Sequence, residues 1–323
     1  MPETLRPKRI LTNIDSRSWE HPADRAALNA LRRIPVFDEV LRKILEMFGE
    51  KATRLAFLAS AVRVSTSQYP RMHRLYDEVC TTLDAPGEYP LYVTQNPLLN
   101  AAAYGMNKPF IIVHDSLVKT FDDDELRVVL GHELGHVMSG HTLYTTMIRI
   151  LLALAQLGFP VVGLAARAIL IALLEWSRKA ELSCDRAGIL AVQDPEPGLR
   201  VMLKFAGGTL EGASLAEFIR QSDEYRETGD LGDQIYKVLN LLGMTHPFPV
   251  LRVAEQRTWY ESGAYERILA GEYIRRGEAP PPYKDDFEEA SKSYRESAKE
   301  TFGQAAEAAR KVMDGFRTGF NQG

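Results

Sequence analysis

The spacing of hydrophobic residues changes twice along the chain and predicts a mostly helical protein with one short region of strands. Over residues 22–83 apolar side chains recur three and four positions apart, as on one face of an amphipathic helix. Over residues 90–113 the apolar runs become short and contain many β-branched residues, which favours strands. Helical spacing then returns, and after Asp194 it continues to Tyr273. The expected fold class is α+β, mostly helical.

The central region predicts three short strands, at residues 91–94, 100–104 and 109–113, with a turn at 105–108 joining the last two. We expect them to form a small antiparallel sheet, directly before the helix that carries the candidate chemistry. An open edge of such a sheet could hold a peptide in an extended form by main-chain hydrogen bonds. The alternative is an edge strand that binds no ligand.

Residues 147–174 form a strongly apolar segment, interrupted by Arg149, Gln156 and Arg167. Its longest stretch without a charge is at the short limit for a membrane-spanning helix, and Pro160 divides that stretch. Each half is too short to cross a membrane alone. We therefore expect a helical hairpin bent at Pro160. A re-entrant hairpin stays open, but we favour burial in the protein or peripheral contact with a membrane surface.

Residues 122–138 predict a helix that contains the sequence His-Glu-x-x-His, formed by His132, Glu133 and His136. Helical geometry places the two histidines about 40° apart, so both imidazoles can reach one metal ion. A catalytic zinc ion takes three protein ligands and keeps one position for water. Glu133 could take the proton from that water as a general base. The first residues of this helix resemble a capping box, which supports the helix start.

A third ligand has to come from elsewhere, and two histidines and a glutamate can also meet in a core helix by chance. Ser139 and Thr142 exclude the metzincin pattern, which needs glycine and histidine at those positions. His141 would lie about 140° round a continuous helix from the second histidine, which favours a structural role. Glu181 and Asp185 are four residues apart in a predicted helix, so the first could bind zinc while the second holds a ligand histidine.

Taken together, these motifs resemble the zinc metallopeptidases of HtpX, the CAAX prenyl proteases and their soluble relatives, which are gluzincins. The resemblance extends over about residues 70–260 and implies a zincin-like metallopeptidase core. It rests on motifs that follow one another in the expected order: Asn100-Ala-Ala, Asp124-Glu-Leu followed by His132-Glu-Leu-Gly-His136 and His141, Ser177-Arg-Lys-Ala-Glu181 followed by Asp185-Arg, and Thr245-His246-Pro247 followed by Arg252.

The resemblance also implies a role for each matched residue. One Zn²⁺ ion per chain would be bound by His132, His136 and Glu181, with Glu133 as the general base and Asp185 supporting a ligand. His246, on a loop before Pro247, would lie near the reacting carbonyl, and Arg252 is a candidate for orienting the site. The substrate edge strand would contain Asn100, Ala101 and Ala102. Cys184 departs from the alanine common in the family, and several hydrophobic spans of the membrane-embedded members are not evident.

The length of 323 residues suits one large domain or a catalytic domain with appendages. We expect an N-terminal helical region at 1–84 and the metallopeptidase domain at 85–275. A proline-rich linker at 276–283 would follow, and then a C-terminal amphipathic helix at 284–323. That helix could dock on its own domain, pair with a second copy or touch a membrane surface. Docking and self-association are favoured.

Charge and cysteine content narrow the remaining choices. The formal net charge of -4 gives no electrostatic case for a nucleic-acid partner. The two cysteines are far apart and predict neither a disulfide framework nor a zinc ribbon, which favours a reducing compartment. Residues 1–20 are polar and carry no signal-peptide pattern. We expect a cytoplasmic protein, and association with the inner face of the membrane stays open.

The sequence thus predicts a zinc-dependent metalloendopeptidase that hydrolyses peptide bonds of protein or peptide substrates. In a thermolysin-like mechanism, Glu133 would activate the attacking water and His246 would stabilise the developing oxyanion. The alternative is a catalytically weak chaperone-like or membrane-associated binding protein that retains the zinc site. Three ligands beside a glutamate favour the enzyme, because structural zinc sites usually use four protein ligands and are rich in cysteine.

Overall fold

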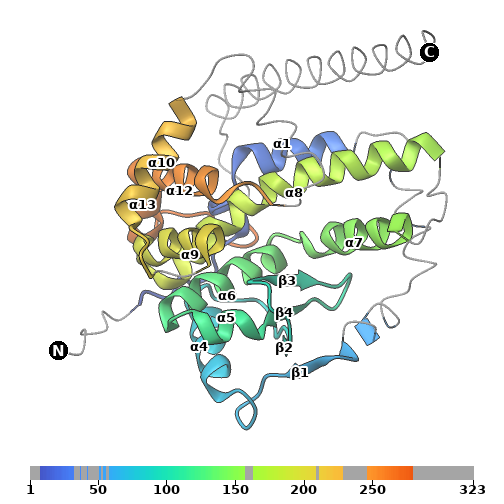
Figure 1. Ribbon diagram of the computed structural model, residues 1–323, viewed down its shortest axis with the longest axis horizontal. Coiled ribbons are helices and arrows are strands. Elements are labelled where there is room, and N and C mark those ends of the chain that lie inside the picture. Colours follow the sequence, from blue (N-terminus) through green and yellow to red (C-terminus); the bar gives the residue numbers. More distant parts are fainter. Residues whose placement is uncertain are drawn as a thin grey trace.

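The computed structural model describes residues 8–32, 58–156, 163–208, 211–227 and 246–278, together with single positions between 33 and 57. The expected bend at Pro160, the helix over 284–323 and most of the linker before it lie outside the described residues. The described part is mostly helical and contains one small sheet (Figure 1), which confirms the expected fold class.

In the described chain, the strands lie in the N-terminal and central parts, and the later part is helical. The N-terminal part contains the 3₁₀ helix η1 (Ser16–Ser18), α1 (Pro22–Leu31), β1 (Ala61–Arg63) and α4 (Pro70–Thr82). The central part contains β2 (Leu91–Thr94), β3 (Ala101–Tyr104), β4 (Phe110–His114), α5 (Asp115–Thr120) and α6 (Asp123–Met138). The later helices are α7 (Thr142–Gln156), α8 (Gly163–Val192), α9 (Pro195–Gly207), α10 (Leu215–Glu227), α12 (Pro249–Glu261) and α13 (Ala264–Ala270).

The sheet is mixed, so the expectation of a purely antiparallel sheet was wrong. Its strand order is β1-β2-β4-β3, with antiparallel pairing of β1 with β2 and of β3 with β4, but parallel pairing of β2 with β4. The reason is that β4 folds back from β3 and inserts beside β2. The hairpin itself was predicted correctly, and it leaves β3 at the edge of the sheet.

Two details of the sheet differ from the sequence-based expectation. β1 lies in a region that was expected to be helical. A strand is recognised by alternating apolar and polar residues, and three residues are too few to show that alternation. Asn100 precedes β3 instead of opening it, although its carbonyl oxygen accepts a hydrogen bond from the His114 backbone N–H at 3.0 Å. The candidate substrate edge therefore begins with a non-strand residue that still contacts the end of β4.

The largest core lies between the sheet, α4, α6, α8 and α9, with α6 near its centre (Figure 1). Close packing of α6 on α8 depends on glycines. A Cβ atom on Gly131 would lie 2.5 Å from the Ala191 Cβ, and one on Gly135 would lie 2.7 Å from the Ala187 Cβ. Side chains at these positions would hold the two helices apart, so the glycines let their backbones approach closely.

The N-terminal residues are part of this same core. Leu11, Ile14 and Trp19 are fully buried in the cluster that contains the apolar face of α4 and the buried face of α6. The backbone N–H of Asp15 donates to the carbonyl oxygen of Ile274, which joins the two ends of the described chain. The division at residue 84 stays a prediction, and the core contains residues from both sides of it.

A second core cluster contains the apolar faces of α7 and α8 together with α1. Met147, Ile148 and Leu151 of α7 are buried against this cluster, as are Ile169 and Leu173 of α8. Among the described residues, no single helix is long and apolar enough to cross a membrane. One pair of helices, α6 with residues 142–154 of α7, has the length and apolar composition of a membrane span when taken together, but the pair is bent by 95° at the break between the two helices.

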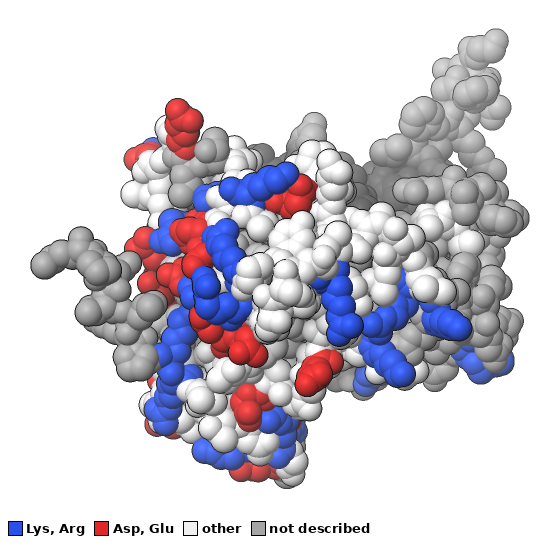
Figure 2. Space-filling model, turned by 90° about the horizontal axis from the view of Figure 1, so that it is seen from below, with Lys and Arg blue, Asp and Glu red and all other residues white. Residues whose placement is uncertain are grey.

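Charges of both signs occur on the surface. On the face seen in Figure 2, acidic and basic side chains are interspersed on the left, while basic side chains without acidic neighbours lie farther right. The acidic and basic totals, 43 and 39 residues, nearly balance.

Candidate metal centre and cleft

Helix α6 carries the His-Glu-x-x-His sequence and begins with the predicted capping box. The Asp122 carboxylate accepts a hydrogen bond from the Glu125 backbone N–H at 2.8 Å, and the Glu125 carboxylate accepts one from the Asp122 N–H at 2.9 Å. Glu125 is fully buried and also pairs with Lys204 at 2.6 Å. These contacts fix the start of α6.

His132, His136 and Glu181 bring two imidazole nitrogens and a carboxylate together between α6 and α8. The two Nε2 atoms are 3.2 Å apart. Glu181 Oε2 lies 3.3 Å from His132 Nε2, and Glu181 Oε1 lies 3.3 Å from His136 Nε2. A tetrahedral zinc ion with ligand bonds of about 2.0–2.1 Å requires ligand atoms separated by roughly 3.3 Å. The three residues therefore have the spacing that a zinc ion needs.

The surroundings of Glu181 also fit a metal ion. Its Oε2 atom is buried and accepts no hydrogen bond from the described residues, which leaves a carboxylate oxygen for a cation to satisfy. Burial opposes ionisation of Glu181, but nearby His246 and His132 hold its pKa well below the ordinary value. A buried, ionised carboxylate is costly unless positive charge compensates it, and a divalent cation supplies that charge.

The two histidines have different electrostatic environments. Burial lowers the pKa of His136 to about 4, which keeps its imidazole neutral, as a metal ligand must be. Burial also acts to lower the pKa of His132, but Glu181 and Asp185 outweigh it and raise the value to about 10. The carboxylates around His132 thus favour positive charge at this position, whether a proton or a metal ion carries it.

Asp185 and Arg252 support His132 from behind. The Asp185 Oδ1 atom lies 3.1 Å from His132 Nδ1, and Arg252 on α12 donates to both carboxylate oxygens, with Nε to Oδ2 at 2.9 Å. All three side chains are buried. With Nδ1 donating its proton to the carboxylate, His132 presents the Nε2 lone pair towards Glu181 and His136.

Glu133 is 5% exposed and lies in the wall of a cleft beside these donors. Burial raises the pKa of Glu133 to about 7, and a hydrogen bond from the Ala103 backbone N–H acts in the opposite direction. A carboxyl group with such a pKa can both accept and return a proton near neutral pH. The residue next to the first histidine therefore has the proton affinity that a general base requires.

The cleft has a volume of about 360 Å³ and is lined by the residues expected from the sequence except His132, Asp185 and Arg252. One wall is the edge strand β3 with Asn100; another is α7, with Ile148 and Leu152. His246 also lines the cleft, is about half exposed, and places Nε2 3.6 Å from Glu181 Oε1.

His141 lies closer to the centre than its expected angle of 140° suggested. That angle assumed a continuous helix, but α6 ends at Met138 and Gly140 adopts a positive φ of 71°. The chain turns there, and the His141 N–H donates to the His136 carbonyl oxygen at 2.9 Å. Its Nδ1 atom lies 3.2 Å from His136 Nδ1, on the side of the ring opposite Glu181.

One buried acidic residue was missed by the sequence analysis. Asp24 of α1 is 2% exposed and its Oδ2 lies 3.2 Å from His141 Nε2. In the sequence, Asp24 is simply an acidic residue in the first turn of a helix that begins at Pro22, a common position for such residues. No feature of the sequence distinguishes it from a residue that stabilises a helix start.

Comparison with known proteins agrees with this geometry. The family model described as Peptidase family M48 matches residues 66–260. Among curated proteins, the plastoglobule-localized metallopeptidase 48, chloroplastic, of Arabidopsis thaliana is 34% identical over 273 residues, covering 81% of this chain and 78% of that protein. No solved structure matches the chain.

Shorter matches link the chain to proteases of the HtpX type. The protease HtpX homolog of Helicobacter pylori is 32% identical over 91 residues, which is 28% of this chain and 29% of that protein. The homolog from Methanothermobacter thermautotrophicus is 30% identical over 87 residues, covering 26% of this chain and 33% of its own length. Each of these two alignments spans at most about a third of either protein.

Proposed function

This chain belongs to peptidase family M48, a family of metallopeptidases, and we propose that it is a zinc-dependent endopeptidase that hydrolyses peptide bonds within protein substrates. One observation carries the proposal. Two imidazole nitrogens and a carboxylate with the spacing of a tetrahedral zinc site lie beside the buried Glu133, whose pKa is about 7, and His136, Glu181 and Glu133 line one cleft. A closed structural site would need neither the glutamate nor the cleft.

The proposed ligands are His132, His136 and Glu181, one zinc ion per chain. Zinc bound there supplies a Lewis acid that polarises the substrate carbonyl and lowers the pKa of a water molecule. Glu133 takes the proton as that water attacks, and then gives it to the leaving amine nitrogen. Because burial brings the pKa of Glu133 to about 7, both transfers are accessible near neutral pH.

His246 and Arg252 complete the proposed machinery. His246 lines the cleft near Glu181 and can donate a hydrogen bond to the substrate carbonyl oxygen as negative charge develops there. Arg252 stays behind the ligands: it grips Asp185, which holds His132, and so orients the site without touching substrate. In this proposal His246 contacts the substrate, whereas Arg252 and Asp185 position the zinc ligand His132.

The substrate is an extended segment of protein chain. Strand β3 lies at the edge of the sheet and its residues line the cleft, so a peptide can add to it by main-chain hydrogen bonds. We assign this edge to Asn100, Ala101 and Ala102. Their small side chains leave space beside the backbone, and recognition of main chain favours unfolded substrates of varied sequence. The alternative, a chaperone-like binding protein, would use the same edge without cleavage.

An assay with an unfolded protein tests the proposal. The purified chain, loaded with one zinc per molecule, is incubated with reduced and alkylated substrate protein, and the products are identified by mass spectrometry. Internal cleavage that a chelator abolishes and added zinc restores is expected. A chain that binds one zinc and leaves the unfolded protein intact would favour the binding-protein alternative.

For location, we propose a cytoplasmic protein that is soluble or bound peripherally to the inner face of the membrane. The relative from Arabidopsis thaliana is named as plastoglobule-localized and chloroplastic, which makes contact with a lipid surface worth testing here. Fractionation of cells answers the question: alkaline carbonate or high salt should release any membrane-bound fraction. Retention of the protein after carbonate would contradict peripheral contact.

A further inference from the structure

A line of buried polar contacts connects His136 with the N-terminal helix α1. His136 Nδ1 lies 3.2 Å from His141 Nδ1, and His141 Nε2 lies 3.2 Å from Asp24 Oδ2. Asp24 and His141 are each 2% exposed, so water does not replace these contacts. The line begins on the side of His136 that faces away from Glu181, and it ends at a carboxylate that is 112 residues earlier in the chain.

The chemistry of Asp24 fixes the direction of every proton in this line. An ionised carboxylate only accepts hydrogen bonds, so His141 must carry a proton on Nε2. In a neutral imidazole the other nitrogen, Nδ1, is then an acceptor. Two groups can donate to that nitrogen, His136 Nδ1 at 3.2 Å and the weaker donor Cys184 Sγ at 3.6 Å. Donation by the nearer group, His136, leaves the lone pair on its Nε2. That lone pair is the one needed for a metal ligand, and Nε2 is the atom that faces Glu181.

We propose that Asp24 is a positioning residue of the metal centre, which acts through His141 to fix the tautomer and orientation of His136. The inference rests on the proposed zinc site and adds to it a support that comes from α1. Residue 24 lies outside the stretch 66–260 that the family model matches. The N-terminal segment is thus part of the metal centre and not only a cover for α8.

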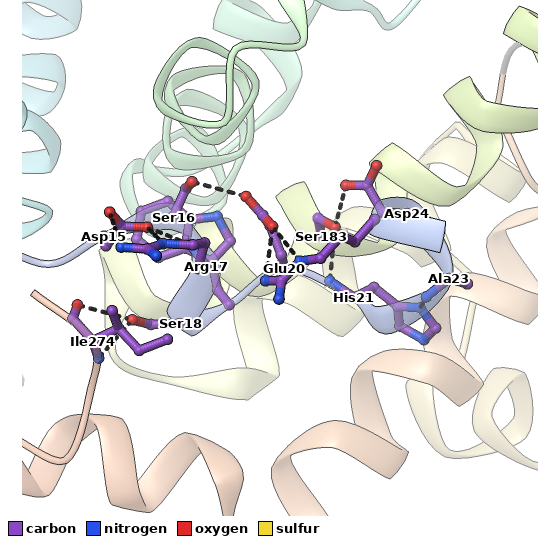
Figure 3. Close-up of polar contacts among 12 residues, drawn as sticks. Asp15, Ser16, Arg17, Ser18, Glu20, His21, Ala23, Asp24, Ser183 and Ile274 are labelled. Carbon is purple, nitrogen blue, oxygen red and sulfur yellow. Dashed lines mark hydrogen bonds and ion pairs between the residues drawn. The ribbon is translucent and has the colours of Figure 1, made fainter. Parts of the chain in front are cut away.

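Two hydrogen bonds from α8 hold the Asp24 carboxylate in one place. Its Oδ1 accepts from Trp176 Nε1 at 2.9 Å, and its Oδ2 accepts from Ser183 Oγ at 2.6 Å. Ser183 in turn accepts from the His21 backbone N–H at 2.9 Å, as Figure 3 shows. Both of these donors belong to α8, the helix that also carries Glu181. Asp24 is therefore fixed relative to the proposed ligand on α8.

Electrostatics agree with an ionised Asp24. Burial acts to raise its pKa, but His141, Ser183 and Trp176 outweigh burial and lower it. The two ligand histidines then have matching supports: the carboxylate of Asp185 contacts His132 directly, and that of Asp24 reaches His136 through one intervening imidazole. A carboxylate behind a ligand histidine fixes its ring and raises its basicity.

The substitution Asp24→Asn tests the proposal with little change of shape. Three donors point at the carboxylate, from Trp176, Ser183 and His141, so the new amide NH₂ must meet at least one of them. If it meets His141, that ring has to move its proton to Nδ1, where it opposes the proton of His136. We expect zinc to transfer to a colorimetric chelator about 10- to 100-fold faster than from the unchanged chain.

Glu125→Gln is the matched control. Glu125 is also a buried carboxylate paired with a neighbour, and it lies on α6, but its contacts are to the helix start and to Lys204. Both variants should unfold at lower temperature than the unchanged chain. Faster zinc release in Asp24→Asn alone supports positioning; equal acceleration in both variants would mean a general loss of stability and would overturn the proposal.

Nitrogen-15 NMR of labelled histidines gives a second readout that needs no variant. The unchanged, zinc-loaded chain should show His136 protonated on Nδ1 and His141 protonated on Nε2. A proton on Nδ1 of His141 would overturn the inference even if Asp24→Asn failed to fold. If the unchanged chain holds no zinc, the proposed function fails as well; if it holds zinc and Asp24→Asn releases it at the same rate, only this inference fails.

Discussion

A Cβ atom on Gly188 of α8 would lie 2.7 Å from the backbone carbonyl oxygen of Val128 on α6. A carbonyl oxygen within a helix cannot turn away as a flexible side chain can. The contact therefore sets how closely the two helices approach. This approach matters because α6 carries two of the proposed zinc ligands and α8 carries the third.

Replacing Gly188 by alanine should separate the two helices and weaken zinc binding as well as stability. Forcing an extra methyl group into a packed core costs roughly 1–3 kcal/mol. Gly207→Ala is the control, because a Cβ atom there meets nothing within 4 Å. Thermal unfolding and zinc titration check both variants. A Gly188→Ala chain with unchanged stability and zinc affinity would show that the spacing of α6 and α8 is not critical.

Arg252→Lys should weaken zinc binding while keeping the positive charge. The guanidinium donates to both oxygens of Asp185, whereas an ammonium cannot make that planar, two-point contact. Loss of such a support typically costs about 10- to 100-fold in metal affinity. Competition with a chelator measures the effect. Arg257→Lys, on the same helix but paired with Asp223, should leave zinc affinity unchanged.

Both cysteines should resist alkylation in the folded protein. Burial raises the pKa of Cys80 to about 12 and that of Cys184 well above its ordinary value, so neither is a thiolate at pH 8. Treatment with iodoacetamide should modify neither thiol in the native chain and both after unfolding in guanidinium chloride. Mass spectrometry counts the modified residues. Rapid modification of Cys184 in the native chain would contradict its burial between α6 and α8.

Glu181→Gln should reduce zinc affinity by about 10- to 100-fold or more, because the neutral amide is a much poorer ligand than the carboxylate. Glu175→Gln provides the control on the same helix, where the carboxylate pairs with Arg178 and Lys179. Elemental analysis after dialysis gives the zinc content of each variant. Full retention of zinc in Glu181→Ala would remove this residue from the ligand set.

The features that the sequence predicted well are those encoded by local patterns. The capping box and the spacing of His132 and His136 are set within a few residues, and the structure contains both. The β3–β4 hairpin follows from its turn and its short apolar strands. In each case the neighbours in sequence are also the neighbours in space, so a helical or two-residue period is sufficient information.

The features that the sequence did not predict depend on contacts between distant segments. β4 pairs in parallel with β2 because it inserts between two strands, which no local pattern specifies. His141 turns back towards His136 because Gly140 adopts a positive φ, and Asp24 reaches it from α1. An acidic residue in a first helical turn has the same appearance in a sequence whether it contacts solvent or a histidine.

The central claim is that Glu133 acts as the base of a zinc peptidase and is not a ligand. Glu133→Gln preserves the size of the side chain and removes the basic carboxylate, so measuring zinc content and peptide-bond hydrolysis on the same sample of this variant tests the claim directly. We expect one zinc per chain together with a loss of roughly 10²-fold or more in the rate of cleavage of an unfolded protein. Near-normal cleavage, or loss of the zinc, would contradict it.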